Sequence, residues 1–435
     1  MEDEFWAQQR NITDPIHGSF DLPMKLFDII DTPQFQRLRD IKQLGTCQYV
    51  YPGAVSTRFI HCIGTAYLAK RWVHQFRTRQ PELEISEELE NLVTTAGLVH
   101  DIGHSVQSHV FEHWMHQAGH ADWNHEHMGG LLFEHIIDTR HLDWERSSIR
   151  MVQDLVLGKV VRQKPWLSQI VANHETGIDV DKFDYIERDC HHLGLKSSFQ
   201  SNRLMEHSRV IGKNIAFLRK EAWNIYELFM SRFSLHRRAY QHRISSTVDH
   251  MMFDVFSNAN SHLRLAEWAQ DVSRYHLLTD SLLGVIRQST APELSSARDI
   301  LNRLDNRDLY PLAAEFLVSQ EHLAELNSLS AQEIVNCQPT GAGLAAQDII
   351  LHKSHINFGK GTQNPVSKVK FYSKANVSST FSLERSDICS LLPATYQEDI
   401  VRVFVRSPKH LDVAKAAVAK LIKRRHLNVT LTSKK

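Results

Sequence analysis

Two histidines and two aspartates stand in an order that can build a metal site. His61 comes first, His100 and Asp101 are adjacent, and Asp181 lies further downstream. Two imidazoles and two carboxylates suit a borderline or hard divalent ion such as Fe, Mn, Zn or Mg. The order His, His-Asp, Asp is also the ligand pattern of a metal-dependent phosphohydrolase. The sequence therefore predicts that these four side chains bind one divalent ion.

The segment before His100-Asp101 is more informative than the dipeptide itself. The chain contains 27 histidines, so that roughly one His-Asp pair is expected by chance. Residues 92–99, however, have the composition of a buried helix, for which Ser86 is the predicted N-cap. Charged groups at the end of a buried helix are costly unless they are paired or metal-bound. A helix end also lets adjacent residues reach one ion, since neighbours on a regular helix point about 100° apart.

A polar stripe continues from the last of these ligands. Asp181, Tyr185 and Asp189 are spaced four residues apart, which places them on one face of a helix. At about 1.5 Å of rise per residue they span roughly 12 Å. One end could hold the metal while the other reaches a sugar hydroxyl. A solvated polar face is the alternative, and it is disfavoured because Asp181 already belongs to the metal pattern.

Arg232, His236 and Tyr240 repeat the four-residue spacing in a second segment. With Arg237 and Arg238 they form the densest basic patch of the chain. Arginines at fixed spacing can bind phosphate oxygens in a forked geometry. Charge runs usually mark a solvated surface, and that alternative stays open.

Further histidines follow the His-Asp pair: His104, His109 and His125, with Glu112 nearby. A phosphate ester hydrolase needs a group that protonates the leaving alkoxide, and cations that balance the growing phosphoryl charge. Histidines beside a metal can do both, although the sequence does not say which one is the acid. Their density favours a shared site over separate structural roles.

The composition is that of a soluble globular protein. The chain has 435 residues, 42% of them hydrophobic and 23% charged, with a formal net charge of zero. No global field therefore favours polyanions, and any nucleotide site must come from local clustering. No apolar run reaches the length of a membrane span, and the acidic N-terminus is unlike a signal peptide. Five sparse cysteines favour an intracellular protein, nuclear or cytoplasmic, with reduced thiols.

The pattern along the chain predicts a mainly α protein. Residues 1–20 resemble an extended entry segment, Thr32-Pro33 the start of a helix, and 209–218 a hairpin. Apart from this hairpin, helical spacing dominates from Thr32 to about residue 260, and we expect helices to continue over 262–335. Beyond this the segments 366–372 and 400–405 alternate like strands, and 412–425 has a helical pattern. We therefore predict a helical domain over 1–335 and a smaller α+β lobe over 336–435.

Together these segments resemble the HD-domain deoxynucleoside triphosphate triphosphohydrolases, in particular the vertebrate members that carry a SAM domain. The resemblance runs from about residue 14 to about 410. It rests on specific stretches and not on the ligand pattern alone. We expect no SAM domain ahead of the HD region. The stretches are 31–39, 41–45, 177–185, 189–194 and 234–242.

The resemblance implies a role for each site residue. His61, His100, Asp101 and Asp181 would be the metal ligands. His109 would be the acid for the 5′ oxygen, with His104 and His125 beside it and Glu112 where the family has an aspartate. The triphosphate would contact Arg58, His104, His109, Lys182 and Arg232. Gln43 and Asp189 would bind the 3′-hydroxyl of the sugar, with Tyr185 beside them, and Leu44 and Tyr240 would close the space at the 2′ carbon.

Activation by nucleotides and assembly into a homo-oligomer, from dimer to tetramer, are further implications. Asp31, Gln36 and Arg39 occupy guanine-reading positions, where Asp can accept from N1 and N2 and Arg can donate to O6. Arg10, Arg203, Lys220, Asn224 and Lys374 match other regulatory positions.

Asn11, His207 and Leu218 depart from the family at this regulatory region. The segment 325–345 does not align with its regulatory loop, and Lys423-Arg424-Arg425 stands where a regulatory tail would be. The guanine activator site is therefore favoured over the second regulatory site.

The leading hypothesis is an enzyme that cleaves dNTPs to deoxynucleoside and inorganic triphosphate by attack of a metal-activated water on the α-phosphorus. Fe, Mn or Zn would occupy the HD site, and Mg would bridge phosphates. An HD phosphodiesterase or nucleotidase acting on monophosphates or cyclic dinucleotides is an alternative, against which Lys182 and Arg232 argue. A third hypothesis is a nucleotide-sensing or single-stranded nucleic-acid-binding protein whose chemistry is secondary. The basic tail suggests weak binding of single-stranded nucleic acid, although such a tail is more often a solvated helix end. The cellular role, between dNTP pool control, antiviral defence and repair, is left open.

Overall fold

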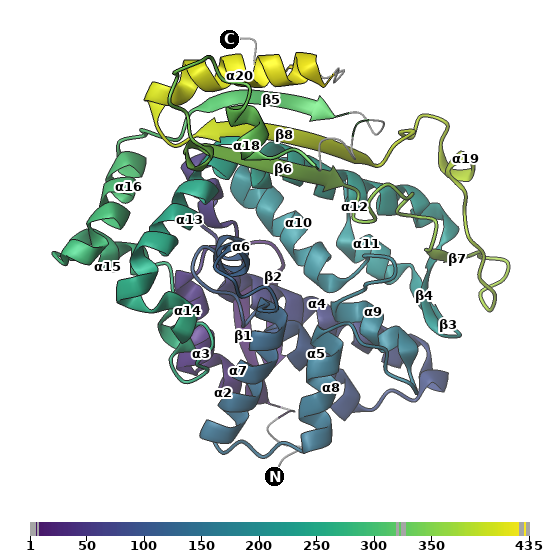
Figure 1. Cartoon of the computed structure of the whole chain (residues 1–435). Helices are drawn as coiled ribbons and strands as arrows, with labels where there is room; N and C mark the ends of the chain where they lie inside the picture. The colour runs from purple at the N-terminus through teal and green to yellow at the C-terminus, as the bar shows by residue number, and fades with distance from the viewer. Residues whose placement is uncertain (1–5, 7, 319–321, 323–327, 426–429, 432–435) are drawn as a thin grey trace.

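A helical body fills most of the molecule, and a curved sheet caps one end of it (Figure 1). The computed structural model describes residues 6, 8–318, 322, 328–425 and 430–431. The protein is mainly α, as predicted. The helices of the first half are α2 (Phe27–Ile30), α3 (Pro33–Gln36), α4 (Arg58–Arg79), α5 (Glu87–Val99), α6 (His109–Gln117), α7 (His125–Thr139), α8 (Arg146–Val156), α9 (Ser168–Val171) and α10 (Val180–Leu193).

Several predicted helix starts are confirmed by their caps. The Thr32 hydroxyl accepts from the Phe35 amide at the start of α3, with Pro33 in the first position. The Ser86 hydroxyl accepts from the Leu89 amide at the start of α5. The later helices are α11 (Ser201–Glu206), α12 (Ala222–Leu235), α13 (Arg243–Leu263), α14 (Leu265–Trp268), α15 (Leu282–Gln288), α16 (Ser295–Asp305), α18 (Ala331–Val335), α19 (Arg385–Ile388) and α20 (Leu411–Arg424).

The strands form three small sheets. The N-terminal entry segment is the antiparallel hairpin of β1 (Gln9–Asp14) and β2 (Gly18–Pro23). The predicted hairpin is confirmed as β3 (Ser208–Ile211) and β4 (Asn214–Leu218), to which β7 (Lys370–Tyr372) adds in parallel. The capping sheet has the order β6-β8-β5-β9, with β5 (Leu312–Val318), β6 (Ile349–Asn357), β8 (Gln397–Val405) and β9 (Thr430–Leu431).

Two predictions of local structure were wrong. Helices do not continue throughout 262–335, because β5 lies within this range and pairs with β8. Its Leu, Ala and Glu residues suit a helix, but ladder pairing and burial override that propensity. In 366–372 only Lys370–Tyr372 is a strand. The preceding residues turn, because Asn364 accepts from the amides of Val366 and Ser367.

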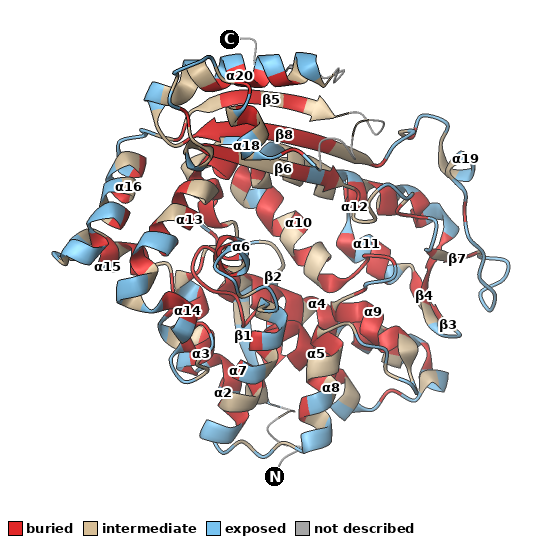
Figure 2. Ribbon diagram, viewed as in Figure 1, coloured by how far each residue is buried: buried red, intermediate tan, exposed pale blue. Residues whose placement is uncertain are grey.

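The two layers bury separate cores. One continuous cluster runs through the helical body and includes Trp72, Phe111 and Phe256. A smaller cluster lies between the outer face of the capping sheet and α20. Figure 2 shows the buried residues concentrated along the inner faces of the helices and across the sheet. Strand β5 precedes the predicted boundary at 335/336 and β8 follows it, so the sheet takes strands from both predicted segments.

Among the described helices, none combines the length and apolar character that crossing a membrane requires. All five cysteines are free, as expected for reduced thiols.

Candidate active site

The four predicted metal ligands meet at one buried point. The Nε2 atoms of His61 and His100 lie 3.1 Å apart. The Nε2 atom of His61 lies 3.4 Å from Asp101 Oδ2 and 3.2 Å from Asp181 Oδ1. That of His100 lies 3.5 Å and 3.6 Å from the same two oxygens. The structure thus gathers side chains that are separated by up to 120 residues of sequence around one centre.

This donor set fits a divalent ion. A tetrahedral or octahedral shell with bonds near 2.1 Å has neighbouring donors about 3.0–3.4 Å apart, close to the spacings observed. Two carboxylates and two neutral imidazoles carry a charge that balances a divalent cation. The ligand side chains are almost wholly buried except for Asp181, and buried carboxylates are costly without such a partner.

Two glycines let the helices that carry these ligands approach closely. His61 lies in the first turn of α4, His100-Asp101 follow α5, and Asp181 lies in the first turn of α10. A Cβ on Gly64 of α4 would overlap the Asp184 carboxylate of α10. A Cβ on Gly97 of α5 would lie 3.0 Å from the Thr65 carbonyl of α4. The absence of side chains there brings the three helices, and so the ligands, together.

A carboxylate missed by the sequence analysis orients His61. The Nδ1 atom of His61 lies 2.7 Å from Asp184 Oδ2. Because a carboxylate only accepts, Nδ1 carries the proton and Nε2 keeps its lone pair for the metal. Asp184 is fully buried and also receives His17 at 2.7 Å and a forked pair of bonds from Arg188, each 2.8 Å. Its position three residues after Asp181, on the same helix, was the available signal.

His100 is fixed in the same way by a backbone carbonyl. Its Nδ1 atom donates to Gly97 O over 2.8 Å, which again leaves Nε2 facing the metal position. Both imidazoles therefore present the nitrogen that a metal needs.

The charges around the ligands shift their titration. Burial opposes a charge on His61, yet the carboxylates of Asp101, Asp181 and Asp184 raise its pKa well above the usual value. Burial likewise opposes the charge of Asp101, and Arg58 with the neighbouring histidines lowers its pKa well below the usual range. A bound cation would take the place of the Nε2 proton of His61 and would pair with the ionised Asp101.

The three further histidines form a second cluster beside the ligands. The rings of His104 and His125 stack with centroids 3.8 Å apart, and the centroid of His109 lies 4.7 Å from that of His104. His125 Nδ1 lies 2.8 Å from Glu112 Oε2, and His109 Nδ1 lies 3.7 Å from the same oxygen. Burial lowers the pKa of His104, and desolvation by the surrounding cavity walls, with Arg58 and His125 nearby, lowers that of His109, so that both favour the neutral form. Only His109 is largely exposed, with 61% of its side chain accessible.

A strained turn leads into His109. Gln107 and Ser108 adopt positive φ angles of 56° and 58°, which side-chain-bearing residues rarely do. The Ser108 hydroxyl accepts from Arg58 Nε over 2.9 Å and donates to Lys42 O over 2.7 Å. Arg58 in turn pairs with Asp101. One guanidinium therefore links a metal ligand to the turn that aims His109.

A buried pair, which the sequence analysis did not identify, holds the loop behind the metal ligands. Arg37 donates to the carbonyls of Ile102 and His104 over 2.6 and 2.7 Å. The Tyr275 hydroxyl donates to Gly103 O over 2.6 Å. These contacts satisfy three successive carbonyls of the irregular loop that follows α5, which a helix end otherwise leaves unpaired.

The residues expected to bind the sugar lie at the other end of the α10 stripe. Asp189 Oδ2 accepts from the Tyr240 hydroxyl over 2.6 Å, and Asp189 Oδ1 has no partner among the described residues. The same holds for Gln43 Oε1. Burial raises the pKa of Asp189 to about 7, and the Tyr240 bond opposes this. Leu44 packs partly buried beside the core.

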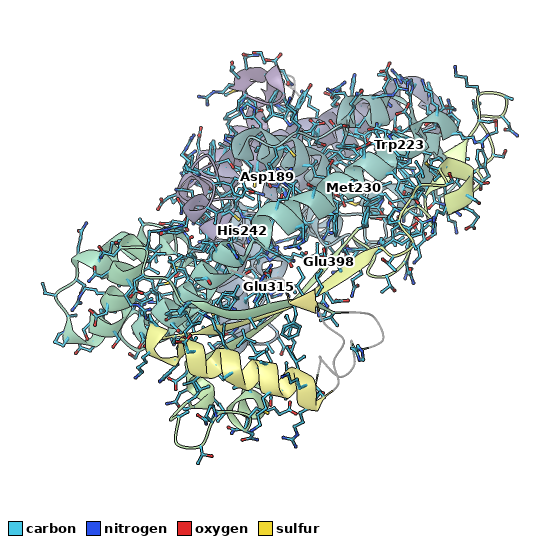
Figure 3. The ribbon with its side chains drawn as sticks, turned by 90° about the horizontal axis from the view of Figure 1, so that it is seen from above. Asp189, Trp223, Met230, His242, Glu315 and Glu398 are labelled. Carbon is cyan, nitrogen blue, oxygen red and sulfur yellow. The ribbon has the colours of Figure 1, made fainter. Side chains whose placement is uncertain are left out.

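A widened helical turn presents Tyr240. Residues His236–Tyr240 form a π-helical turn between α12 and α13, a feature that frequently marks functional sites. Figure 3 places Asp189 beside this end of α12. Burial and Arg232 lower the pKa of His236 to about 3, so its ring is neutral.

One cavity of about 900 Å³ joins all these groups. Two cationic side chains that line the cavity bind neighbouring protein groups. Lys182 Nζ lies 3.0 Å from Asp179 Oδ2, and Arg232 Nη1 donates to Asn357 O over 2.7 Å. Every residue that the sequence analysis assigned to the metal, the sugar or the triphosphate lines this cavity, except His61 beneath it. Those lining residues are Gln43, Leu44, Arg58, His100, Asp101, His104, His109, His125, Asp181, Lys182, Tyr185, Asp189, Arg232 and Tyr240.

The expected guanine-reading residues lie together on the surface, away from the cavity. Arg10 Nη1 lies 3.8 Å from Asp31 Oδ2, and its guanidinium covers the Phe27 ring at 4.6 Å. Arg39 Nε donates to Gln36 Oε1 over 2.8 Å.

Of the other regulatory candidates, Arg203 lines a smaller cavity of about 420 Å³ near α11, together with His207. Arg203 pairs with the buried Glu221 at 2.9 Å, and Lys220 Nζ lies 2.8 Å from His207 Nε2. Asn224 donates to Gln200 O over 3.0 Å. Lys374 follows β7, whose Tyr372 pairs with Leu218 of β4, two residues before Lys220.

Comparison with known proteins agrees with this geometry. Residues 58–189 match the HD domain, a class of metal-binding hydrolase domain, and the matched segment begins at Arg58 and ends at Asp189. The chain is 37% identical over 420 residues to the deoxynucleoside triphosphate triphosphohydrolase SAMHD1 homolog of Dictyostelium discoideum, covering 96% of this chain and 81% of that protein.

Vertebrate proteins of the same name are nearly as similar. The identity is 35% to SAMHD1 of Bos taurus, over 91% of this chain and 74% of the relative. It is 34% to SAMHD1 of Homo sapiens, over 91% and 70%. The chain therefore belongs to the SAMHD1 family of deoxynucleoside triphosphate triphosphohydrolases and is an HD-domain hydrolase.

Proposed function

We propose that this protein hydrolyses deoxynucleoside triphosphates to deoxynucleoside and inorganic triphosphate. The observation that carries this proposal is the single cavity with metal-binding donors at its centre and the unpartnered Asp189 carboxylate oxygen beyond them. A ligand that spans both would place a phosphate at the metal and a sugar hydroxyl at Asp189. The related proteins bear the name of this activity.

The residues of the cavity divide between binding and proton transfer. A divalent ion held by His61, His100, Asp101 and Asp181 would lower the pKa of a bound water and polarise the phosphoryl oxygen. Arg58, Lys182 and Arg232 balance the triphosphate, for which Lys182 and Arg232 exchange their present partners for phosphate oxygens. Attack at the α-phosphorus breaks its bond to the 5′ oxygen.

His109 is the group we assign to the leaving oxygen. It is the accessible histidine of its cluster, and the Glu112 carboxylate lies within reach of its Nδ1 atom. Bound triphosphate adds negative charge, which raises the pKa that burial has lowered and favours a protonated ring. His125, held by Glu112 over 2.8 Å, and His104 complete the support of this ring.

The sugar end selects deoxyribose in this scheme. Asp189 Oδ1 and Gln43 Oε1 are acceptors aimed at the 3′-hydroxyl, with Tyr185 one helical turn before Asp189. Leu44 and Tyr240 leave a 2′-hydroxyl without a polar partner, which disfavours ribonucleotides.

Regulation by nucleotides is the second part of the proposal. GTP would bind at Asp31, Gln36 and Arg39, and a further GTP or dNTP would bind near the α11 cavity. The surface position of both groups, outside the active-site cavity, supports a separate role. The other regulatory candidates are Arg203, Lys220, Asn224 and Lys374 at this second position, and Arg10, which lies beside Asp31 at the first.

The metals we propose are Fe, Mn or Zn at the HD site, with Mg on the phosphates.

Assembly into a homo-oligomer would accompany activation. A surface suited to assembly is exposed on α12, where Trp223 and Met230 are 51% and 42% accessible. Figure 3 shows both side chains along the outer side of this helix.

The test is incubation of the metal-loaded protein with dGTP and GTP, followed by separation of the products. We expect inorganic triphosphate and deoxyguanosine, and no turnover by Asp101→Ala, which lacks a metal ligand. Asp305→Asn, a carboxylate change at the Arg287 ion pair between α15 and α16, whose residues do not line the cavity, serves as the control and should retain activity. Release of pyrophosphate or orthophosphate in place of triphosphate would reject the proposal.

A further inference from the structure

A chain of hydrogen-bonded polar groups lines the cavity at the face opposite the metal ligands. His250 of α13 and His352 of β6 join through Nε2 and Nδ1 over 3.1 Å. His352 Nε2 lies 2.7 Å from the Ser354 hydroxyl. His250, His352 and Ser354 all line the active-site cavity, and none has a part in the reaction described above.

The position of this chain corresponds to the nucleobase, an assignment that rests on the proposed function. The 5′ phosphates lie at the metal position and the sugar at Asp189 and Tyr240, so the base must extend away from both. Helix α6 leads from His109 to His113, both on the cavity wall, and α13 packs against it. The rest of the lining at that end comes from α13 and β6 and includes Phe253 and His250.

The alternation of β6 explains why the sheet reaches the cavity. Ile350 of this strand joins the core of the helical body, whereas Ile349 joins the core under α20. Residues two apart share a face of a strand, so His352 and Ser354 face the helical body with Ile350. Figure 1 shows β6 lying across the helices at this end.

Both imidazoles are neutral near pH 7. Burial lowers the pKa of His250 to about 4 and, with His250 beside it, lowers that of His352 to about 3. The other charged or titratable groups near them are His113, Arg402 and the Asp254–Arg406 pair. A neutral imidazole has one donor and one acceptor nitrogen.

The direction of the chain can therefore reverse. If Ser354 donates to His352 and His352 to His250, the Nδ1 atom of His250 is a donor. If every bond is reversed, Nδ1 becomes an acceptor. Within the described part of the chain no other group bonds to this atom.

We propose that the Ser354–His352–His250 chain contacts the base edge of the bound nucleotide and adapts its hydrogen-bonding sense to the base. Adenine and cytosine offer an amino donor where guanine and thymine offer a carbonyl acceptor. A reversible chain satisfies either class without a repulsive contact. It would therefore reduce the differences in kcat/KM among the four dNTPs. Phe253, beside His250 with ring centroids 5.3 Å apart, adds apolar contact.

The experiment compares kcat and KM for the four dNTPs in the wild type, His250→Leu and His352→Leu. We expect His250→Leu, which removes the contact, to raise KM for all four dNTPs. His352→Leu removes the partner that reverses His250 and should shift the ratio of kcat/KM between the amino and carbonyl bases by roughly 2- to 10-fold, the range of one neutral hydrogen bond. His262→Gln, at the far end of α13 and paired with Glu293, is the matched control and should leave KM and the ratio unchanged. An unchanged ratio in His352→Leu, or an unchanged KM in His250→Leu, would overturn the proposal.

A rescue variant and a binding measurement accompany this comparison. His352→Gln keeps both a donor and an acceptor and should restore the wild-type ratio, whereas a merely structural role predicts no such rescue. Titration calorimetry with the four deoxynucleosides makes the same comparison without turnover. Absence of triphosphate release by the wild type would therefore reject the reaction, while base-independent binding in the wild type and both Leu variants would reject the base contact.

Discussion

The buried carboxylate of Asp184 determines which ring nitrogen of His61 carries the proton. It accepts from His61, His17 and Arg188 at once, and Arg188 in turn bonds Asp14 over 3.0 Å. A charge this deeply buried is tolerable because every lone pair is used. The same network that stabilises Asp184 fixes the tautomer of the metal ligand.

Asp189 is the opposite case, because one of its oxygens is unsatisfied. Burial raises its pKa to about 7, above the value of an unfolded chain. Between pH 4 and 7 the unfolded state ionises while the folded state does not, so this carboxyl makes the fold progressively less stable as the pH rises. Every tenfold difference in acidity between the folded and unfolded states corresponds to about 1.4 kcal/mol.

We predict that Asp189→Asn stabilises the protein at pH 8 by on the order of 2 kcal/mol and has less effect at pH 5. The amide removes the buried charge and can still accept from Tyr240. KM for dNTPs should rise about 10-fold or more, because a charged acceptor for the 3′-hydroxyl is lost. Thermal melting at both pH values and steady-state kinetics measure the two effects. An equal loss of stability at both pH values would contradict the assigned pKa.

At the scale of residues, the sequence predicted the metal ligands but not the residues that orient them. His61, His100, Asp101 and Asp181 follow from residue type and order, since few side chains bind metals. Asp184 and Arg37 act through contacts with groups distant in sequence, and their types are common. Their roles depend on three-dimensional proximity, which spacing alone does not encode.

At the scale of elements, a close backbone contact joins α7 to the loop after α5, which carries the ligands His100 and Asp101. A Cβ on Gly103 would overlap the carbonyl oxygen of His125 and the amide of Gly129. Backbone atoms cannot move aside as a flexible side chain can. The contact sets the distance between the His100-Asp101 ligands and His125.

Gly103→Ala should therefore destabilise the protein by about 3 kcal/mol or more and abolish triphosphate release. Gly130→Ala, one residue beyond Gly129 on α7, is the matched control, because its Cβ would lie 3.7 Å from Gln153, an ordinary contact. That variant should be neutral or stabilised by up to about 1 kcal/mol. Urea unfolding followed by circular dichroism measures both, and similar midpoints for the two variants would contradict this account of the contact.

The elements also show where propensity misleads. Helix α20 and strand β8 carry periodic patterns that long-range contacts reinforce, and both were predicted. Strand β5 has helix-forming residues, and only pairing with β8 makes it a strand. Since that partner lies about 85 residues later, no local window contains the information.

At the scale of the whole molecule, the capping sheet joins the helical body through buried polar contacts. Arg402 of β8 bonds Glu315 of β5 and the Ser246 hydroxyl of α13. Arg406 bonds Asp254 of α13 over 2.7 Å. Such contacts are directional, so they fix the orientation of the sheet over the cavity more closely than apolar packing alone would.

The outer side of α12 leaves two large apolar side chains exposed, and a second copy of the chain is the partner we propose for them. Trp223 and Met230 are seven residues apart and so lie on one face of the helix. This helix continues into the π turn that carries His236 and Tyr240. Burial of α12 in an assembly would therefore act on the active site directly through a continuous element.

Met230→Lys should weaken this assembly at least about 10-fold, because an unpaired charge would be buried, and twice over if the contact is two-fold symmetric. Light scattering after size-exclusion chromatography, with GTP and a dNTP present, should show a smaller species than the wild type and proportionally lower triphosphate release. Val285→Lys makes the same change at an exposed position of α15 and should assemble as the wild type does. If Met230→Lys and Trp223→Lys both assemble normally, α12 is not the interface. The proposed link between assembly and the active site through the π turn would then be rejected as well.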